Sequence, residues 1–330
     1  MTLLLSRTDI EGLVSMAEVI EAVENAHADI SRRTAYQPAP ITLTLASGSG
    51  SFLPMAALAD RQALAAVKFL ADIPDNATRG LPRQRSVVVL LSQTTGECEA
   101  IIDGQILTRQ RTAAASAVAS RHLARPDSNV LGLIGAGNLA VEHVKALREV
   151  LPIKRVLVWS RTDTTIVKFL ERARGPLDGV EVEVMGSPRD VVLRSDVLCT
   201  LTPAREPIVQ GDWFPPGLHV NAVGAPPRPD HREIDSRGMA RAEVFVDSFA
   251  TAIKKSGDVL LAIADGLITE DKIRRELGDV ITGVFPGRTG RDDITLFDSV
   301  GIAMQDLAIG NLLLKRARST GLGVDLDLSR

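Results

Sequence analysis

The sequence has few of the residues that form disulfides and metal sites. Its 330 residues include two cysteines, Cys98 and Cys199, and five histidines. The cysteines lie in separate predicted strands without CxxC spacing, and the histidines show no HExxH pairing. We therefore expect buried, unpaired thiols and no bound metal.

The chain also lacks a strong charge excess and long apolar runs. Its formal net charge of -3 offers no field that would attract nucleic acid. No apolar run is long enough to span a bilayer, and the N-terminus becomes charged at Arg7 and Asp9 before a signal-peptide core develops. The composition is typical of a soluble globular protein, and the length fits two domains. We expect a cytoplasmic protein that binds neither nucleic acid nor membranes.

The N-terminal part mixes helices with antiparallel strands. Ser15, followed by Glu18 three residues later, predicts the cap of an amphipathic helix that reaches Ile30. A second helix is predicted over about 111–123, and the turn residues 125–129 predict the crossing into the next domain. Strands are predicted at 41–45, 51–55, 64–70, 87–91 and 97–102.

From Val130 onward, short apolar strands alternate with helical patterns. This order predicts an α/β fold with a doubly wound parallel sheet of the Rossmann type, beside the α+β unit formed by the N-terminal part. A long helix predicted over 298–317 could pack on the first domain or on a second subunit. The strands are predicted at 130–134, 155–159, 180–185, 197–201, 219–223 and 244–246.

The most informative motif is VLGLIGAGNLA at 130–140. It predicts a strand, a tight turn at Gly135 and Gly137, and a helix whose close packing on the strand is permitted by Ala140. Such a turn directs the amides of a helix N-terminus at a pyrophosphate. Because a second strand follows at the expected distance, the motif predicts a bound dinucleotide.

The end of that second strand favours NADP(H) over NAD(H). Proteins that select NAD usually carry an acidic residue there for the ribose 2′-hydroxyl, whereas this chain has Ser160, Arg161 and Thr162. An arginine and two hydroxyls suit a 2′-phosphate. In the alternative, Arg161 is a solvated loop residue, Asp163 contacts the ribose, and NAD(H) binds.

Two basic residues are candidates for binding a carboxylate. Arg111 stands at the predicted start of a helix, where backbone amides would add to its charge. Lys68 lies inside the apolar run 64–71, and a buried lysine needs an anion or a lowered pKa. Strand alternation equally allows Lys68 to face solvent.

Arg83 and Arg85 precede the strand predicted from Val87. At positions i and i+2 they would point to one face and could together hold a second acid group, although a solvated strand end explains them as well. The loop at 222–230 leaves the carboxyl end of a predicted strand, where ligands bind in open α/β folds, and its Gly224 would let the backbone approach nicotinamide.

Over nearly its whole length the chain resembles the ornithine cyclodeaminase/mu-crystallin family. The resemblance implies a discontinuous substrate and dimerisation domain (1–125 plus 299–330) around a nucleotide domain (126–298). It also implies that Lys68 and Arg111 face the substrate carboxylate, and that Ser299 and Val300 line the nicotinamide pocket. The matching stretches are Lys68, PDN at 74–76, GLP at 80–82, RTAAASA at 111–117, GAG at 135–137, NAVGA at 221–225, EID at 233–235, SGDV at 256–259 and FDSVGIA at 297–303.

Departures from the family pattern argue against cyclodeamination. Cyclodeaminases of this family carry an aspartate after the VGG/A step, where this chain has Pro226, and a glutamate where it has Ser51. A family arginine after Gln-Pro is replaced by Pro40, and Arg83 stands where relatives often carry a small hydroxyl residue. Positive charge is thus moved within the site, not removed.

We therefore expect reduction of an α-imino acid to an L-amino acid by hydride transfer from NAD(P)H. If Arg83 and Arg85 bind a second carboxylate, the substrate is a small dicarboxylic imine such as iminosuccinate; cyclic ketimines such as piperideine- or pyrroline-2-carboxylate are the competitors. Alternatives are a cyclodeaminase or a crystallin-like protein that binds cofactor and carboxylate without turnover. A homodimer is expected. The candidate cofactor-binding residues are Arg83, Gln84, Arg111, Gly135, Gly137, Asn138, Leu139, Ser160, Arg161, Thr162, Thr202, Val223, Gly224, Ala225 and Ser299.

Overall fold

The computed structural model describes residues 1–328 and divides into two compact units. Unit 1 comprises Met1–Arg111 and the chain from Ile302 onward, and unit 2 comprises Thr112–Gly301. No helix within residues 1–328 is long and apolar enough to cross a membrane. Both cysteines are free thiols, with Cys199 buried and Cys98 half-buried.

Unit 1 contains an eight-stranded sheet in the order β15-β1-β7-β6-β5-β4-β2, with β3 paired to β4. All neighbours pair antiparallel except β1 and β7, so the unit is of the expected mixed type. The strands are β1 (Thr2–Leu5), β2 (Ala35–Tyr36), β3 (Leu43–Thr44), β4 (Ser51–Ala59), β5 (Leu64–Asp72), β6 (Gln84–Ser92), β7 (Cys98–Asp103) and β15 (Val324–Leu326).

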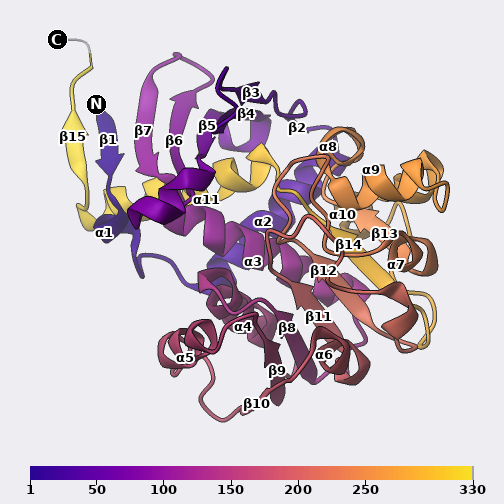
Figure 1. Cartoon of the computed structure of the whole chain (residues 1–330). Coiled ribbons are helices and arrows are strands. Elements are labelled where there is room, and N and C mark those ends of the chain that lie inside the picture. The colour runs from indigo at the N-terminus through magenta and orange to yellow at the C-terminus, as the bar shows by residue number, and fades with distance from the viewer. Residues whose placement is uncertain (329–330) are drawn as a thin grey trace. The chain divides into compact units, whose positions relative to one another are not determined.

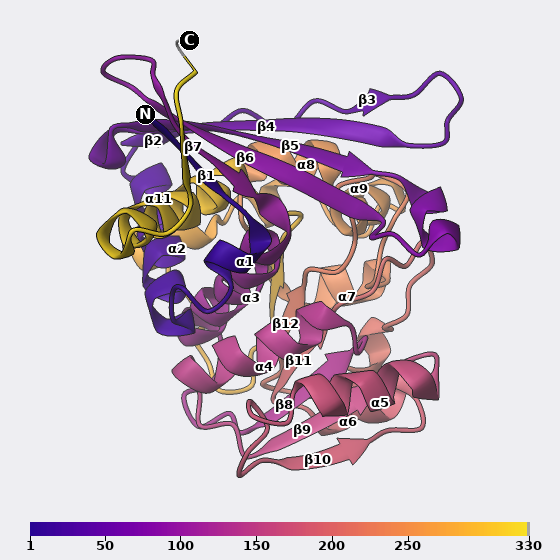
Figure 2. The ribbon, with the colours of Figure 1, turned by 90° about the vertical axis from the view of Figure 1, so that its left-hand side faces the viewer.

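Helices α2 (Met16–Ser31) and α11 (Ala303–Thr320) cover one face of this sheet (Figure 2). The predicted cap of α2 is confirmed, because Ser15 Oγ accepts from the Glu18 amide at 3.3 Å and Glu18 Oε2 accepts from the Ser15 amide at 2.9 Å. The last helix packs on α2, β4, β5 and β6 within its own chain. It begins later than predicted, because Asp298 ends a strand. A short helix α1 (Arg7–Ile10) follows β1.

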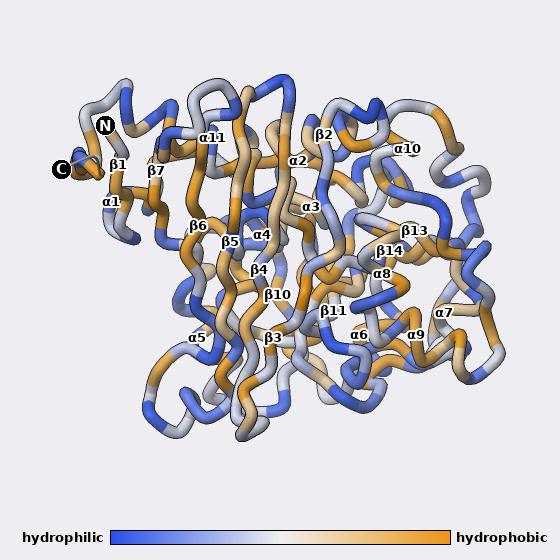
Figure 3. Tube along the Cα trace, turned by 90° about the horizontal axis from the view of Figure 1, so that it is seen from above, coloured by the Kyte–Doolittle hydropathy of each residue, from blue (hydrophilic) through white to orange (hydrophobic). Residues whose placement is uncertain are grey.

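The opposite face of the unit 1 sheet, here called the outer face, is apolar. Its exposed apolar side chains include Leu4, Leu58, Val67, Phe69 and Val87, each between 37% and 45% exposed. Hydrophobic residues recur along β4, β5 and β6, which run side by side in Figure 3. Strand alternation places Lys68 on the other face, which is buried. This excludes the alternative prediction that Lys68 faces solvent.

Helix α3 (Gly104–Leu123) contains the boundary between the units. The predicted boundary at residue 125 therefore differs from the structural division after Arg111. The later part of α3 belongs to unit 2 because its serines bond there: Ser116 Oγ lies 2.9 Å from His143 Nε2, and Asn221 donates to Ser120 Oγ at 3.0 Å. Arg111 lies within α3 and not at its start, so the predicted help from the helix N-terminus is wrong.

Unit 2 is built on a seven-stranded sheet in the order β10-β9-β8-β11-β12-β14-β13, all parallel (Figure 1). This confirms the doubly wound Rossmann-type sheet. One strand, β14, was not predicted and lies between β12 and β13. The strands are β8 (Val130–Ile134), β9 (Arg155–Trp159), β10 (Glu181–Val184), β11 (Val197–Thr200), β12 (His219–Ala222), β13 (Glu243–Val246) and β14 (Thr295–Asp298).

The helices of unit 2 flank this sheet and close a large apolar core. Leu198, Val220, Val244 and Leu296, from neighbouring strands, are fully buried in it. The helices are α4 (Asn138–Val150), α5 (Asp163–Arg172), α6 (Pro188–Arg194), α7 (Ser236–Arg241), α8 (Phe249–Lys255), α9 (Gly257–Ala264) and α10 (Leu277–Ile281).

Candidate functional sites in the two units

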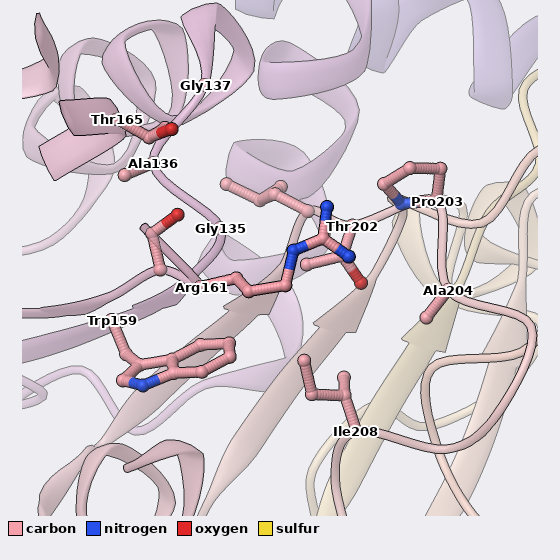
Figure 4. Close-up of a pocket in the computed structure, with 12 residues that line it drawn as sticks. Gly135, Ala136, Gly137, Trp159, Arg161, Thr165, Thr202, Pro203, Ala204 and Ile208 are labelled. Atoms are coloured by element: carbon pink, nitrogen blue, oxygen red, sulfur yellow. The ribbon is translucent and has the colours of Figure 1, made fainter. Parts of the chain in front are cut away.

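A pocket of about 350 Å³ lies at the carboxyl ends of β8, β9 and β11 in unit 2. This edge is where parallel sheets of this type bind nucleotides. Figure 4 shows the residues that line it. They are Gly135, Ala136, Gly137, Trp159, Ser160, Arg161, Thr165, Leu201, Thr202, Pro203, Ala204 and Ile208.

The two glycines of the predicted turn have different roles. Gly135 has a φ of +106°, and a Cβ there would lie 2.9 Å from the Leu201 carbonyl oxygen, so the turn requires glycine. Gly137 caps α4 without a side-chain hydrogen bond, and a Cβ there would enter open space. The first amides of α4 are therefore accessible to a pyrophosphate, which fits a bound dinucleotide.

The 2′-phosphate candidates lie at the end of β9. Ser160 and Arg161 line the pocket, and the Arg161 side chain reaches into it (Figure 4). Arg161 is exposed and has no hydrogen bond or ion pair within residues 1–328. Thr162 caps α5, and its hydroxyl lies 2.7 Å from that of Thr165. No carboxylate is among the lining residues; Asp163 begins α5 outside them.

Other predicted cofactor residues lie outside this pocket lining. Asn138 accepts from Arg172 at 2.6 Å, and Leu139 follows it in the first turn of α4. Val223, Gly224 and Ala225 follow β12. Ser299 follows β14 and donates to Asp247 Oδ2 at 2.7 Å, and Val300 is the next residue.

Glu233 joins the loops that follow β11 and β12. Its Oε1 accepts from the Thr202 amide at 2.6 Å and the Thr202 hydroxyl at 2.7 Å. Its Oε2 accepts from the Thr200 hydroxyl and the Gly224 amide, both at 2.8 Å. Glu233 is fully buried, so these four donors fix the positions of Thr202 and Gly224. Sequence reasoning placed Glu233 in a family motif but assigned it no role.

The surroundings of Glu233 are unusually acidic. Burial, together with the neighbouring Asp258 carboxylate, raises the pKa of Glu233 to about 7. Asp258 Oδ1 in turn accepts from the amides of Glu233 and Ile234 at 2.9 and 2.8 Å, and burial raises its pKa to about 6. Burial also raises the pKa of Asp298 at the end of β14. The carboxyl edge of this sheet is held by backbone and hydroxyl donors bonded to buried acids.

In unit 1, the structure brings Lys68 and Arg111 together at one carboxylate, Asp306 of α11. Lys68 Nζ lies 3.0 Å and Arg111 Nε 3.4 Å from Asp306 Oδ1. Lys68 Nζ also donates to the Thr108 hydroxyl at 2.7 Å. The side chains of Lys68, Arg111 and Asp306 are 0%, 8% and 1% exposed. Two buried cations against one carboxylate leave a net positive charge, which suits an anionic ligand.

Burial lowers the pKa of Lys68 to about 8. This value is the net result of burial and the nearby Arg111 charge, which lower the pKa, and of the charge and hydrogen bond of Asp306, which raise it. Lys68 is therefore mostly protonated at neutral pH and loses its charge in mildly alkaline solution.

Arg83 and Arg85 have different surroundings. Arg83 precedes β6, and its Nε donates to Asp72 Oδ1 at 2.7 Å. Arg85 lines a separate hollow with Arg7 and Asp103. The two side chains thus have different neighbours, although the Ile73 amide donates to the Arg83 carbonyl oxygen at 2.9 Å and the pairing with β5 continues to Arg83. That both arginines hold one acid group stays a prediction. Gln84, in register with Asp72, is exposed.

Comparison with known proteins agrees with this architecture. The family model described as the ornithine cyclodeaminase/mu-crystallin family matches residues 1–321, and the chain belongs to this family. The Thermococcus litoralis Δ1-pyrroline-2-carboxylate reductase, solved with NADH and L-proline, is 36% identical with a TM-score of 0.95, covering 98% of this chain and 100% of that one. An archaeal alanine dehydrogenase dimer with bound NAD is 31% identical, with a TM-score of 0.93 and 99% of both chains covered. The iminosuccinate reductase of Paracoccus denitrificans with NAD⁺ is 28% identical, with a TM-score of 0.91 and 99% of both chains covered.

Proposed function

We propose that this protein reduces the C=N bond of an α-imino acid to an L-amino acid, with NAD(P)H as the electron donor. The observation that carries the proposal is the buried pair Lys68 and Arg111, whose two positive charges meet a single carboxylate. This pair suits the α-carboxylate that every α-imino acid has. The turn at Gly135 and the open N-terminus of α4 suit the dinucleotide, and imine reductases are among the solved relatives.

The reaction requires little acid or base chemistry from the protein. Held at the Gly135 turn and the N-terminus of α4, NAD(P)H would supply the hydride that reduces the imine carbon. An imine is readily protonated near neutral pH, so the nitrogen lone pair becomes the new N–H bond without a dedicated acid, and Lys68, with its pKa of about 8, can donate a proton if one is needed. Holding the carboxylate with Lys68 and Arg111 fixes the position of the imine carbon, and such positioning supplies most of the rate.

We propose NADP(H) as the preferred cofactor, with NAD(H) as the alternative. Arg161 lines the pocket without an ion-pair partner in the described chain, and no lining residue is acidic. A 2′-phosphate would find a cation and the hydroxyl of Ser160, and no carboxylate among the lining residues would repel it. The solved relatives contain NADH, NAD or NAD⁺, so the preference rests on this chain's own residues.

Among imines, we propose a cyclic ketimine with one carboxylate, such as pyrroline- or piperideine-2-carboxylate. Arg83 is paired with the buried Asp72, so its charge is already compensated, and Arg85 lies with Arg7 and Asp103. Neither arginine therefore supports binding of a second substrate carboxylate. Iminosuccinate is the second candidate, favoured by its reductase among the relatives.

Two other activities have less support. Cyclodeamination lacks the family aspartate at Pro226, and Ser51, where that activity uses a glutamate, begins β4. A crystallin-like binding role uses the same cations as catalysis, so only turnover separates the two. We also propose a cytoplasmic location, since two free thiols suit a reducing compartment.

We propose a homodimer that buries the outer face of unit 1. Exposed apolar patches of this kind mark protein interfaces. Phe69 stacks on Phe52 at 5.5 Å between ring centroids, which makes a rigid apolar surface beside Val67 and Leu58. A second copy is the favoured occupant because the alanine dehydrogenase relative is a dimer.

Loss of reduced-nicotinamide absorbance tests the proposed function. NADPH and NADH are each mixed with pyrroline-2-carboxylate, with piperideine-2-carboxylate, and with oxaloacetate plus ammonia. Turnover of a cyclic ketimine with NADPH is expected. Turnover only with oxaloacetate and ammonia would replace the cyclic substrate by iminosuccinate. Tight NADPH binding without turnover of any imine would favour the binding role.

A further inference from the structure

Two adjacent residues of α11 contact the candidate carboxylate-binding cations: Asp306 contacts both, and Gln305 contacts Arg111. Asp306 Oδ1 accepts from Lys68 Nζ and Arg111 Nε at 3.0 and 3.4 Å, and Gln305 Oε1 accepts from Arg111 Nη1 at 3.1 Å. Both residues are at most 1% exposed. They lie near the start of the helix, which begins at Ala303.

The contacts of Gln305 continue to His27 of α2. Gln305 Nε2 lies 3.1 Å from His27 Nε2. Because the amide oxygen already accepts from Arg111, the amide nitrogen is the donor, and His27 Nε2 must be the unprotonated acceptor. Burial lowers the pKa of His27 to about 4, so the ring is neutral near pH 7 and adds no charge to the group.

Asp306 is the sole negative charge in direct contact with Lys68 among the described residues. Lys68 is also faced by Arg111 and the neutral Thr108 from α3. The residues in register with Lys68 on β4 and β6 are the uncharged Met55 and Val88. Asp72, on the same face of β5, is paired with Arg83, and His27 of α2 is neutral. Asp306 Oδ2 has no hydrogen-bond partner in the described chain, so Lys68 and Arg111 alone compensate its charge.

We propose that Gln305 and Asp306 are positioning residues that fix the orientation and the charge of the carboxylate-binding pair Lys68 and Arg111. Asp306 holds the two cations at one oxygen and keeps the ammonium of Lys68 charged. Gln305 holds the guanidinium of Arg111 from the other side without adding charge, and His27 sets the direction of its amide. The proposal rests on the proposed function only in taking the ligand to be a carboxylate.

Asp306 is charged and Gln305 is neutral, so one variant can remove a negative charge and another can add one. Opposite effects of these two variants separate a positioning role from a purely structural one. Asp306→Asn removes the negative charge beside Lys68, and Gln305→Glu adds one beside Arg111. Asp29→Asn is the matched control: Asp29 is also a buried aspartate of unit 1, paired with Arg61 at 2.9 Å.

The test is the affinity of pyrrole-2-carboxylate, a planar monocarboxylate, measured by calorimetry between pH 6 and 10 with NADP⁺ present. The wild-type affinity should fall above about pH 8 as Lys68 loses its proton. The midpoint of this fall should move to lower pH in Asp306→Asn and to higher pH in Gln305→Glu. In Gln305→Glu the affinity at pH 7 should also fall about tenfold, because the new carboxylate competes for Arg111. The midpoint should stay unchanged in Asp29→Asn.

Equal midpoints in all four proteins, or shifts in one direction that the control shares, would overturn the proposal. If Asp306→Asn does not fold, Gln305→Met keeps the test open: it should weaken the probe about tenfold without moving the midpoint, and unchanged affinity would refute the positioning role of Gln305. Probe binding is measured without turnover. A protein that binds the probe as described but reduces no imine would therefore contradict the proposed function and leave this inference intact.

Discussion

Replacing Arg161 by alanine should remove the preference for NADPH. The guanidinium lines the pocket at the end of β9, is exposed, and has no competing partner among the described residues. A hydrogen bond to a charged group contributes about 1.5–3 kcal/mol, and exposure to solvent places this one at the lower end. About 1.5 kcal/mol corresponds to about a tenfold change in affinity. The Kd of NADPH, from fluorescence titration, should rise by that factor, while the Kd of NADH should stay within about twofold.

The matched control is Arg174→Ala, which removes an equal charge from an exposed position of unit 2 outside the pocket lining. It should leave both dissociation constants unchanged. Equal weakening of NADPH and NADH by Arg161→Ala would mean that the side chain binds a part common to both cofactors. A wild-type protein that binds NADH more tightly than NADPH would refute the assignment of Arg161 to the 2′-phosphate.

Four further outcomes follow from the contacts described above. Lys68→Met should raise the KM for the imine at least about tenfold and leave the KM for NADPH unchanged in steady-state kinetics; equal effects on both would contradict a carboxylate-binding role. In the wild type, kcat/KM should fall above about pH 8, because the lowered pKa of Lys68 means that the binding cation is lost there; a flat profile to pH 10 would contradict this. Glu233→Gln should weaken NADPH about tenfold or more, since its amide NH₂ would face hydroxyl and amide donors; an unchanged Kd would show that the loops hold without it. Phe69→Glu should yield monomers in sedimentation analysis and Val167→Glu, on exposed α5, should not; a dimer that survives Phe69→Glu would exclude the outer face.

The nucleotide-binding half of the fold could be predicted because its signals are local. The strand before Gly135, the turn and the helix after it occupy consecutive residues, and β8 and β9 have the predicted bounds. Strand β14 was missed because Val300 and Ile302 continue a helical spacing, so the predicted helix took in Asp298. Parallel pairing with β12 and β13 makes this segment a strand, and both of these strands are distant from it in sequence.

The candidate carboxylate site could be predicted only in part, for the same reason. Lys68 was identified by its charge within an apolar run. Its partner Asp306 lies 238 residues further along the chain, and nothing in the spacing of a predicted helix distinguishes it from a solvated residue. The ion pair of Arg83 with Asp72 could not be predicted either, because it joins residues of two different strand segments. Each error concerns an interaction that depends on tertiary packing.

The central claim is that the chain reduces a cyclic α-imino acid at the expense of a reduced nicotinamide. Its most direct test is the initial rate of NADPH oxidation with pyrroline-2-carboxylate, with chiral analysis of the product. The account predicts that L-proline forms in amounts equal to the NADPH consumed, and that Lys68→Met raises the KM for pyrroline-2-carboxylate at least about tenfold. No oxidation of NADPH or NADH by cyclic ketimines or by oxaloacetate with ammonia, in a protein that binds the cofactor, would contradict it.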